Sequence, residues 1–283
     1  MSDVLRIDGL TLGIRTEDGV TPILSGVDLA VDAGVVQGLA GESGSGKTMT
    51  GLAVMGLEPP TAVTSGHVWL GEDDLLAMTG KTLNAVRGRR IGMVFQDPST
   101  SLHPQLTVGA QLTDHVRYHL KVSRAEARER AAAGLARVGI PGGSAALSRY
   151  PHEYSGGQRQ RIAIAIAMAC GPEVLILDEP TTALDVTVQA GVLALLRELV
   201  DSLGLAVLFI THDLGVMSAI ADRVAVMRHG EIVENGPRDQ VFLAPQHAYT
   251  RSLLASLPGA AGGLTTRDDL ARLAALSEGG TDE

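Results

Sequence analysis

Short segments with alternating apolar and polar positions, rich in β-branched residues, fill the first third of the chain. Such segments predict strands, and the Asp-Gly and Asp-Ala-Gly sequences between them predict turns. A helical pattern follows at 47–57 and stops before two prolines, which end a helix. The expected strands are 4–7, 11–15, 27–31, 35–40, 66–70 and 91–95.

Helical periodicity replaces this pattern between residues 97 and 155. Segments 107–120 and 123–138 are helical in period, and Ser123 is a suitable N-cap for the second. Helices and strands then alternate, which predicts an α/β fold with a mainly parallel sheet and an inserted helical subdomain. The expected helices are 156–169, 186–202 and a short one after 210, and the expected strands are 174–177, 206–210, 223–227 and 231–234.

Composition narrows the class of protein. The chain has 283 residues, 45% of them hydrophobic, so it is long enough to bury a sizeable core. Its net charge of −9 and the lack of a basic cluster argue against nucleic acid as a partner. The longest apolar run, 162–170, is far shorter than the roughly 20 residues that span a bilayer. The N-terminus lacks a signal pattern, and the expectation is a cytosolic chain.

One segment has the composition of a phosphate-binding loop, G-x-x-x-x-G-K-[ST]. Its glycines allow backbone N–H groups to converge on an anion, a helix N-terminus favours phosphate, and the lysine and threonine suit phosphate oxygens and Mg²⁺. A glycine-rich turn without a ligand is the alternative, but the strand before and the helix after the loop favour the motif. The loop reads Gly41-Glu42-Ser43-Gly44-Ser45-Gly46-Lys47-Thr48.

Two carboxylates end the apolar strand at 174–177. Asp178 lies where Mg²⁺ needs a ligand, and Glu179 lies one step further, where it can act as general base on a water. Taken alone, the pair could also be a solvated strand end. A GTPase is not supported, because no lysine of the chain (Lys47, Lys81, Lys121) stands in an N-K-x-D motif.

The segment Tyr154-Ser155-Gly156-Gly157-Gln158 resembles the signature motif of ABC-transporter ATPases, L-S-G-G-Q, with tyrosine in place of leucine. A capped helix start would have the same form, because serine is a good N-cap. Three further positions nevertheless follow the family order. Gln96 resembles the Q-loop glutamine, Ala183-Leu184-Asp185 the D-loop and His212 the switch histidine.

The resemblance covers about residues 5–258 and implies an ABC ATPase fold: a RecA-like α/β P-loop core with an antiparallel β subdomain and an inserted α-helical subdomain. The expected boundaries are 1–96 for the β subdomain and first part of the core, 97–155 for the helical subdomain, 156–258 for the rest of the core and 259–283 for an acidic tail with at most one short helix. Leu102 and Leu106 are expected on the face of the helical subdomain that meets a permease.

The resemblance also implies roles for the site residues. ATP and Mg²⁺ are the expected cofactors, with Mg²⁺ held by Thr48, Gln96 and Asp178. Glu179 is the expected base and His212 contacts the γ-phosphate. In a head-to-tail dimer, Ser155–Gln158 and Asp185 serve the nucleotide of a second, homologous ATPase subunit.

Segments 95–104, 150–157, 182–189 and 247–254 resemble the dipeptide, oligopeptide and nickel importer subgroup. This implies two membrane permeases, an extracytoplasmic binding protein, and a place on the cytoplasmic face of the bacterial membrane. The alternative is a soluble ABC ATPase that acts on DNA or ribosomes.

Two features depart from the family pattern. No aromatic residue or histidine stands between Leu12 and Leu24, where many members stack the adenine base. The only cysteine, Cys170, lies far from the region in which many members of the subgroup carry a cysteine cluster, so no iron–sulfur cluster is expected.

Overall fold

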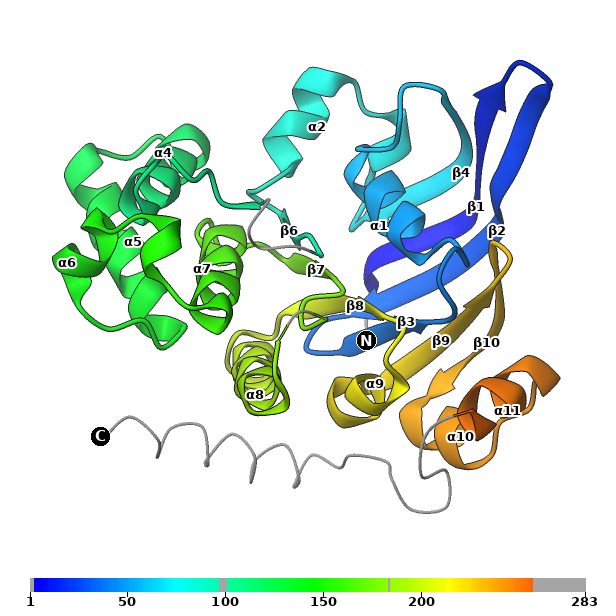
Figure 1. Cartoon of the computed structure of the whole chain (residues 1–283). Helices are drawn as coiled ribbons and strands as arrows, with labels where there is room; N and C mark the ends of the chain where they lie inside the picture. The colour runs from blue at the N-terminus through cyan, green and yellow to red at the C-terminus, as the bar shows by residue number, and fades with distance from the viewer. Residues whose placement is uncertain (1–2, 97–100, 183, 257–283) are drawn as a thin grey trace. The chain divides into compact units, whose positions relative to one another are not determined.

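The computed structural model describes residues 3–96, 101–182 and 184–256. These residues belong to two compact units, coloured along the chain in Figure 1. The first unit comprises 3–83 and 200–256, and the second the described residues between 84 and 199. The predicted short tail helix lies outside the described residues, as does Ala183.

An antiparallel sheet of the order β2-β1-β4-β5 forms one layer of the first unit. The two strands predicted at 4–7 and 11–15 are a single strand, and that prediction of a break was wrong. Gly9 has a φ of 56° at an irregularity in the pairing, and its N–H donates to Asp28 Oδ1 at 2.7 Å, so the chain kinks without ending the strand. The strands are β1 (Asp3–Thr16), β2 (Gly19–Asp32), β4 (Ala62–Leu70) and β5 (Asp73–Asp74).

Parallel strands form the second layer of this unit. β3 (Val36–Ala40) pairs in parallel with β8 (Ala206–Thr211) on one side and β9 (Arg223–Arg228) on the other. Every residue of β3 and β8 is buried, as expected for parallel strands covered on both faces. β10 (Glu231–Pro237) returns antiparallel to β9. The helices of this layer are α1 (Lys47–Met55), α9 (Leu214–Ile220), α10 (Arg238–Leu243) and α11 (Ala248–Ala255).

A group of helices dominates the second unit (Figure 1). Helix α4 (Val108–Leu120) packs against α5 (Arg124–Arg137), and both contact α6 (Gly143–Ser148) and α7 (Gly156–Met168). The start of α5 confirms the prediction of Ser123 as N-cap, because its side chain accepts the N–H of Glu126 at 3.2 Å. Thr107 caps α4 in the same way.

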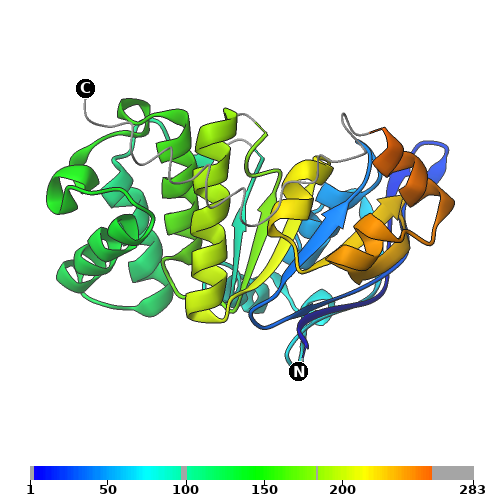
Figure 2. The same ribbon diagram turned by 90° about the horizontal axis from the view of Figure 1, so that it is seen from below.

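Two parallel strands, β6 (Ile91–Val94) and β7 (Val174–Asp178), complete the second unit. Helix α7 packs on β6 and lies beside α8 (Val186–Leu203), as Figure 2 shows. Gly157 permits this close approach, because a Cβ there would lie 2.2 Å from Val188 Cγ1. The N-terminus of α7 is therefore packed against α8.

The α/β class predicted from the alternation of elements is confirmed. Within the described residues, the predictions missed the short helices α2 (Gly80–Val86), α6, α10 and α11, the last of which starts at a histidine cap. None of the helices in the part of the chain that the structure describes has both the length and the apolar character needed to cross a membrane.

Candidate active site

The glycine loop joins the buried strand β3 to helix α1 in the first unit. Gly41, Gly44 and Gly46 have φ values of 152°, 79° and 111°, which L side chains rarely adopt. A Cβ at Gly41 would lie 2.2 Å from the carbonyl oxygen of Met227, and one at Gly46 would lie 2.7 Å from Leu24. At Gly41 and Gly46, glycine is therefore required both by the backbone conformation and by the lack of room for a side chain.

Lys47 is only 5% exposed, and its ammonium group is held by the loop that precedes it. Its Nζ donates to the carbonyl oxygens of Gly41 and Glu42, both at 2.8 Å, and lies 3.5 Å from Ser45 Oγ. No side chain caps the N-terminus of α1, and its first turn carries no acidic residue. The loop thus joins a buried cation to an uncapped helix N-terminus, the two groups that attract phosphate.

His212 lies in the same unit, directly after β8, and is exposed. The next residue, Asp213, caps α9 by accepting the N–H of Val216 at 3.0 Å, and its own N–H donates to Thr211 Oγ1 at 3.0 Å. These two hydrogen bonds of Asp213 therefore fix the backbone that directly follows His212.

The paired carboxylates lie at the end of β7 in the second unit. Asp178 is the buried last residue of that strand, and Glu179 has a φ of 47°, an uncommon backbone conformation for glutamate. Thr182 Oγ1 donates to Glu179 Oε2 at 2.9 Å, and Gln96 Nε2 donates to the same oxygen at 3.4 Å. The structure therefore brings the predicted Gln96 and Glu179 together, and adds Thr182, which sequence reasoning missed.

The signature segment forms the start of α7. Ser155 Oγ accepts the N–H of Gln158 at 3.3 Å, and Gln158 Oε1 accepts the N–H of Ser155 at 3.0 Å, which is a capping box. Tyr154, in the position of the family leucine, is 4% exposed, and its hydroxyl donates to the Ala146 carbonyl oxygen at 2.7 Å. The tyrosine thus fills a core position with its polar atom satisfied.

Asp185 has a similar local role at α8. Its Oδ1 accepts the N–H of Val188, the third residue of that helix, at 3.0 Å. Ser155 and Asp185 are both exposed at helix starts, where backbone N–H groups are directed outward. Of the predicted D-loop, Leu184 and Asp185 lie within the described residues.

The chemistry of these residues fits a nucleoside triphosphate and a hard divalent cation. The loop 41–48 offers backbone N–H groups and a cation to phosphate. Thr48, Gln96 and Asp178 offer hydroxyl, amide and carboxylate oxygens, the ligand types that Mg²⁺ prefers. Thr48 belongs to the first unit and the other two to the second.

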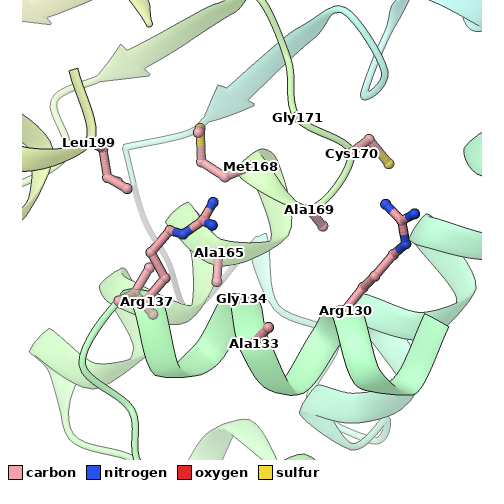
Figure 3. A pocket seen from close by; sticks show the side chains of 11 residues that line it. Arg130, Ala133, Gly134, Arg137, Ala165, Met168, Ala169, Cys170, Gly171 and Leu199 are labelled. Atoms are coloured by element: carbon pink, nitrogen blue, oxygen red, sulfur yellow. The ribbon is translucent and has the colours of Figure 1, made fainter. Parts of the chain in front are cut away.

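A pocket of about 270 Å³ lies elsewhere in the second unit, between α5, the end of α7 and α8 (Figure 3). It contains none of the predicted site residues, and Arg130, Arg137 and Cys170 are among its lining residues. Burial raises the pKa of the Cys170 thiol, against the opposing effect of Arg89 and Arg130. A thiol with a raised pKa is a poor nucleophile at neutral pH.

The glycine loop, the carboxylates after β7 and the capped start of α7 on this α/β scaffold define an ATP-binding cassette, the fold of the ABC ATPases. The family model described as "ABC transporter" matches residues 24–182. The chain belongs to the ABC transporter family, and its enzymatic class is ATPase.

Curated relatives cover most of the chain. It is 45% identical to the oligopeptide transport ATP-binding protein OppD of Bacillus subtilis over 90% of this chain and 72% of that protein. It is also 45% identical to the dipeptide transport ATP-binding protein DppD of the same organism, over 91% of this chain and 78% of that protein. Among solved structures, the ATP-binding cassette MJ0796, a dimer bound to ADP and Pi, matches with a TM-score of 0.73 and 27% identity, over 83% of this chain and 98% of that one.

Proposed function

We propose that this chain is the ATP-hydrolysing subunit of a bacterial importer of peptides. The observation that carries the nucleotide part is the buried Lys47, held by two loop carbonyls beside an uncapped helix N-terminus. The substrate class rests on the relatives that are named for oligopeptide and dipeptide transport.

The residues of the first unit would bind the triphosphate. The N–H groups of loop 41–48 other than that of Glu42 would direct partial positive charge to the phosphates, and Lys47 would add a full charge. His212 is our proposed contact to the γ-phosphate, because it is exposed at the end of a strand that pairs with β3.

The residues of the second unit would supply the cation ligands and the base. Asp178 and Gln96, with Thr48 from the other unit, are the proposed Mg²⁺ ligands, and this ion would neutralise developing phosphate charge. Glu179 would take the proton of the attacking water. Thr182 and Gln96 orient the carboxylate for that step, because both donate to Glu179 Oε2.

We propose that two ATPase subunits pair head to tail, as a homodimer or with a homologous chain. Ser155–Gln158 and Asp185 of each would then face the nucleotide of the other. The exposed helix start at Ser155 supports this, since the capping box does not engage the N–H groups of Gly156 and Gly157, which can serve a phosphate outside the chain. Two permeases and an extracytoplasmic binding protein complete the proposed importer, and this subunit would sit on the cytoplasmic face of the membrane.

Two measurements test the proposal. The fluorescent analogue mant-ATP should bind to the wild-type chain and should be lost in Lys47→Ala, while Lys81→Ala, an exposed lysine, should bind normally. Cells that lack the gene should recover uptake of a labelled tripeptide with the wild-type chain and not with Glu179→Gln.

Recovered uptake of nickel without that of peptide would contradict the substrate class. Association with DNA ends or ribosomes in place of membrane proteins would favour the non-transport alternative.

A further inference from the structure

The segment 247–254 has no role in the site described so far. In the structure its residues start and form most of helix α11, in the same unit as the glycine loop (Figure 1). The carboxylate of Glu234 on β10 anchors the helix start, because its two oxygens accept the N–H groups of Gln246 at 2.7 Å and His247 at 3.0 Å. Burial alone would raise the pKa of Glu234, but these N–H groups hold it below its usual range.

This anchored helix places Tyr249 against the outside of the glycine loop. Tyr249 is 8% exposed, and its phenol oxygen accepts the backbone N–H of Glu42 at 3.4 Å. The carbonyl of the same residue, Glu42, accepts from Lys47 Nζ at 2.8 Å. Glu42 is therefore held on its N–H side by α11 and on its carbonyl side by the lysine of the motif.

The turn between β9 and β10 supports the same contact from a second direction. The guanidinium of Arg228 lies 4.8 Å from the centroid of the Tyr249 ring. Two residues later, the N–H of Gly230 donates to the carbonyl oxygen of Ser45 at 2.9 Å. The tyrosine ring thus rests on a turn that itself holds the loop.

We infer that Tyr249 is a positioning residue of the nucleotide site, which fixes the start of the glycine loop so that Lys47 is presented to phosphate. This inference rests on the proposed function. Two hydrogen bonds in series carry it. The Tyr249 hydroxyl accepts the Glu42 N–H, and the Glu42 carbonyl accepts from the Lys47 ammonium group. The Glu42 N–H is directed to Tyr249, so it takes no part in holding phosphate.

Tyr249→Phe removes only the hydroxyl and keeps the ring on Arg228. The loss of one hydrogen bond predicts mant-ATP binding about threefold to tenfold weaker. Hydrogen exchange of the Glu42 amide, measured without nucleotide, should become faster, and the midpoint of thermal unfolding should stay near that of the wild type. Tyr118→Phe, the same change at an exposed tyrosine of α4, is the matched control and should alter none of the three.

Each outcome decides between alternatives. Unchanged affinity and unchanged exchange at Glu42 in Tyr249→Phe would overturn the inference, and a fall in the unfolding midpoint alone would leave Tyr249 as a packing residue only. Binding of mant-ATP by the wild-type chain and by Lys47→Ala tests the proposed function separately from the role of Tyr249. If the wild type binds mant-ATP and Lys47→Ala does not, the proposed function stands and Tyr249→Phe judges the inference alone. A wild-type chain that binds no mant-ATP would overturn both.

Discussion

Gln96 and Glu179 meet at a single carboxylate oxygen, because Gln96 Nε2 donates to Glu179 Oε2 at 3.4 Å. The hydroxyl of Thr182 donates to the same oxygen at 2.9 Å. Two hydrogen bonds thus hold the carboxylate of Glu179. The backbone of this residue is in a left-handed conformation, which costs free energy and needs support from its surroundings. This arrangement connects a residue shortly after β6 to the carboxylate after β7.

Replacing Glu179 by glutamine should abolish turnover while nucleotide still binds. The amide preserves the size of the side chain but cannot accept a proton, and losing a general base lowers the rate by roughly 10²–10⁴-fold. Steady-state ATP hydrolysis and mant-ATP binding are the measurements. Thr182→Ala leaves the carboxylate in place and should reduce the rate less. Hydrolysis by Glu179→Gln within a factor of about two of the wild-type rate would show that another group is the base.

Gly41→Ala and Gly44→Ala should differ sharply in effect. The added methyl group at Gly41 would lie 2.2 Å from the Met227 carbonyl oxygen, whereas at Gly44 nothing lies within 4 Å of it. Gly44→Ala therefore meets only the unfavourable φ, which destabilises by about 1–2 kcal/mol. Gly41→Ala must also displace backbone, so we expect a larger loss of unfolding free energy in urea and the loss of mant-ATP binding. Equal effects of the two variants would contradict this explanation.

Ser155→Arg should stop hydrolysis at the nucleotide site of the other subunit. If capping occurs in trans, this variant paired with a partner that lacks its own loop lysine should still hydrolyse ATP at its own site. Adding Lys47→Ala to Ser155→Arg, with a wild-type partner, should remove activity at the remaining site.

Ser123→Arg controls for the loss of a helix cap, because it makes the same change at the start of α5. The cap itself is worth about 1 kcal/mol at either position. A defect of Ser155→Arg that is confined to the chain's own nucleotide site would rule out the head-to-tail arrangement.

Leu106→Glu should uncouple transport without impairing the ATPase of the soluble subunits. Leu106 belongs to the second unit and is 43% exposed, so a charge there can prevent docking on a permease without entering the core. Leu102 is 2% exposed, and its predicted place on the docking face was wrong. Leu102→Glu should lower the thermal midpoint by burying an unpaired charge. Tripeptide uptake at the wild-type rate with Leu106→Glu would place the docking surface elsewhere.

Sequence reasoning worked where a local signal decides the structure. The strand that ends at Asp178 is five consecutive buried residues, and Ser123 and Ser155 are helix caps that serine chemistry alone predicts. The glycine loop followed from its own residue types. These features depend on neighbours within a few positions.

Sequence reasoning failed where distant residues decide the structure. The break predicted near Gly9 does not occur, because Asp28 accepts the Gly9 N–H from the neighbouring strand. The contact of Tyr249 with Glu42 joins positions 207 residues apart. The resemblance at 247–254 marked Tyr249 without indicating what it touches. Leu102 carried no signal that separates it from the exposed Leu106.

The capping box at the start of α7 sets the hydrogen-bond polarity of the surface that would face an incoming subunit. Ser155 Oγ uses a lone pair to accept the Gln158 N–H, and this bond leaves the hydroxyl hydrogen unused. The Gln158 side chain holds the Ser155 N–H in return, so the serine is oriented before any partner arrives. The hydroxyl keeps its hydrogen to donate, and a phosphate oxygen is a suitable acceptor for it. The helix cap thereby holds a hydrogen-bond donor in place at the start of α7, where an anionic acceptor of the other subunit would meet it.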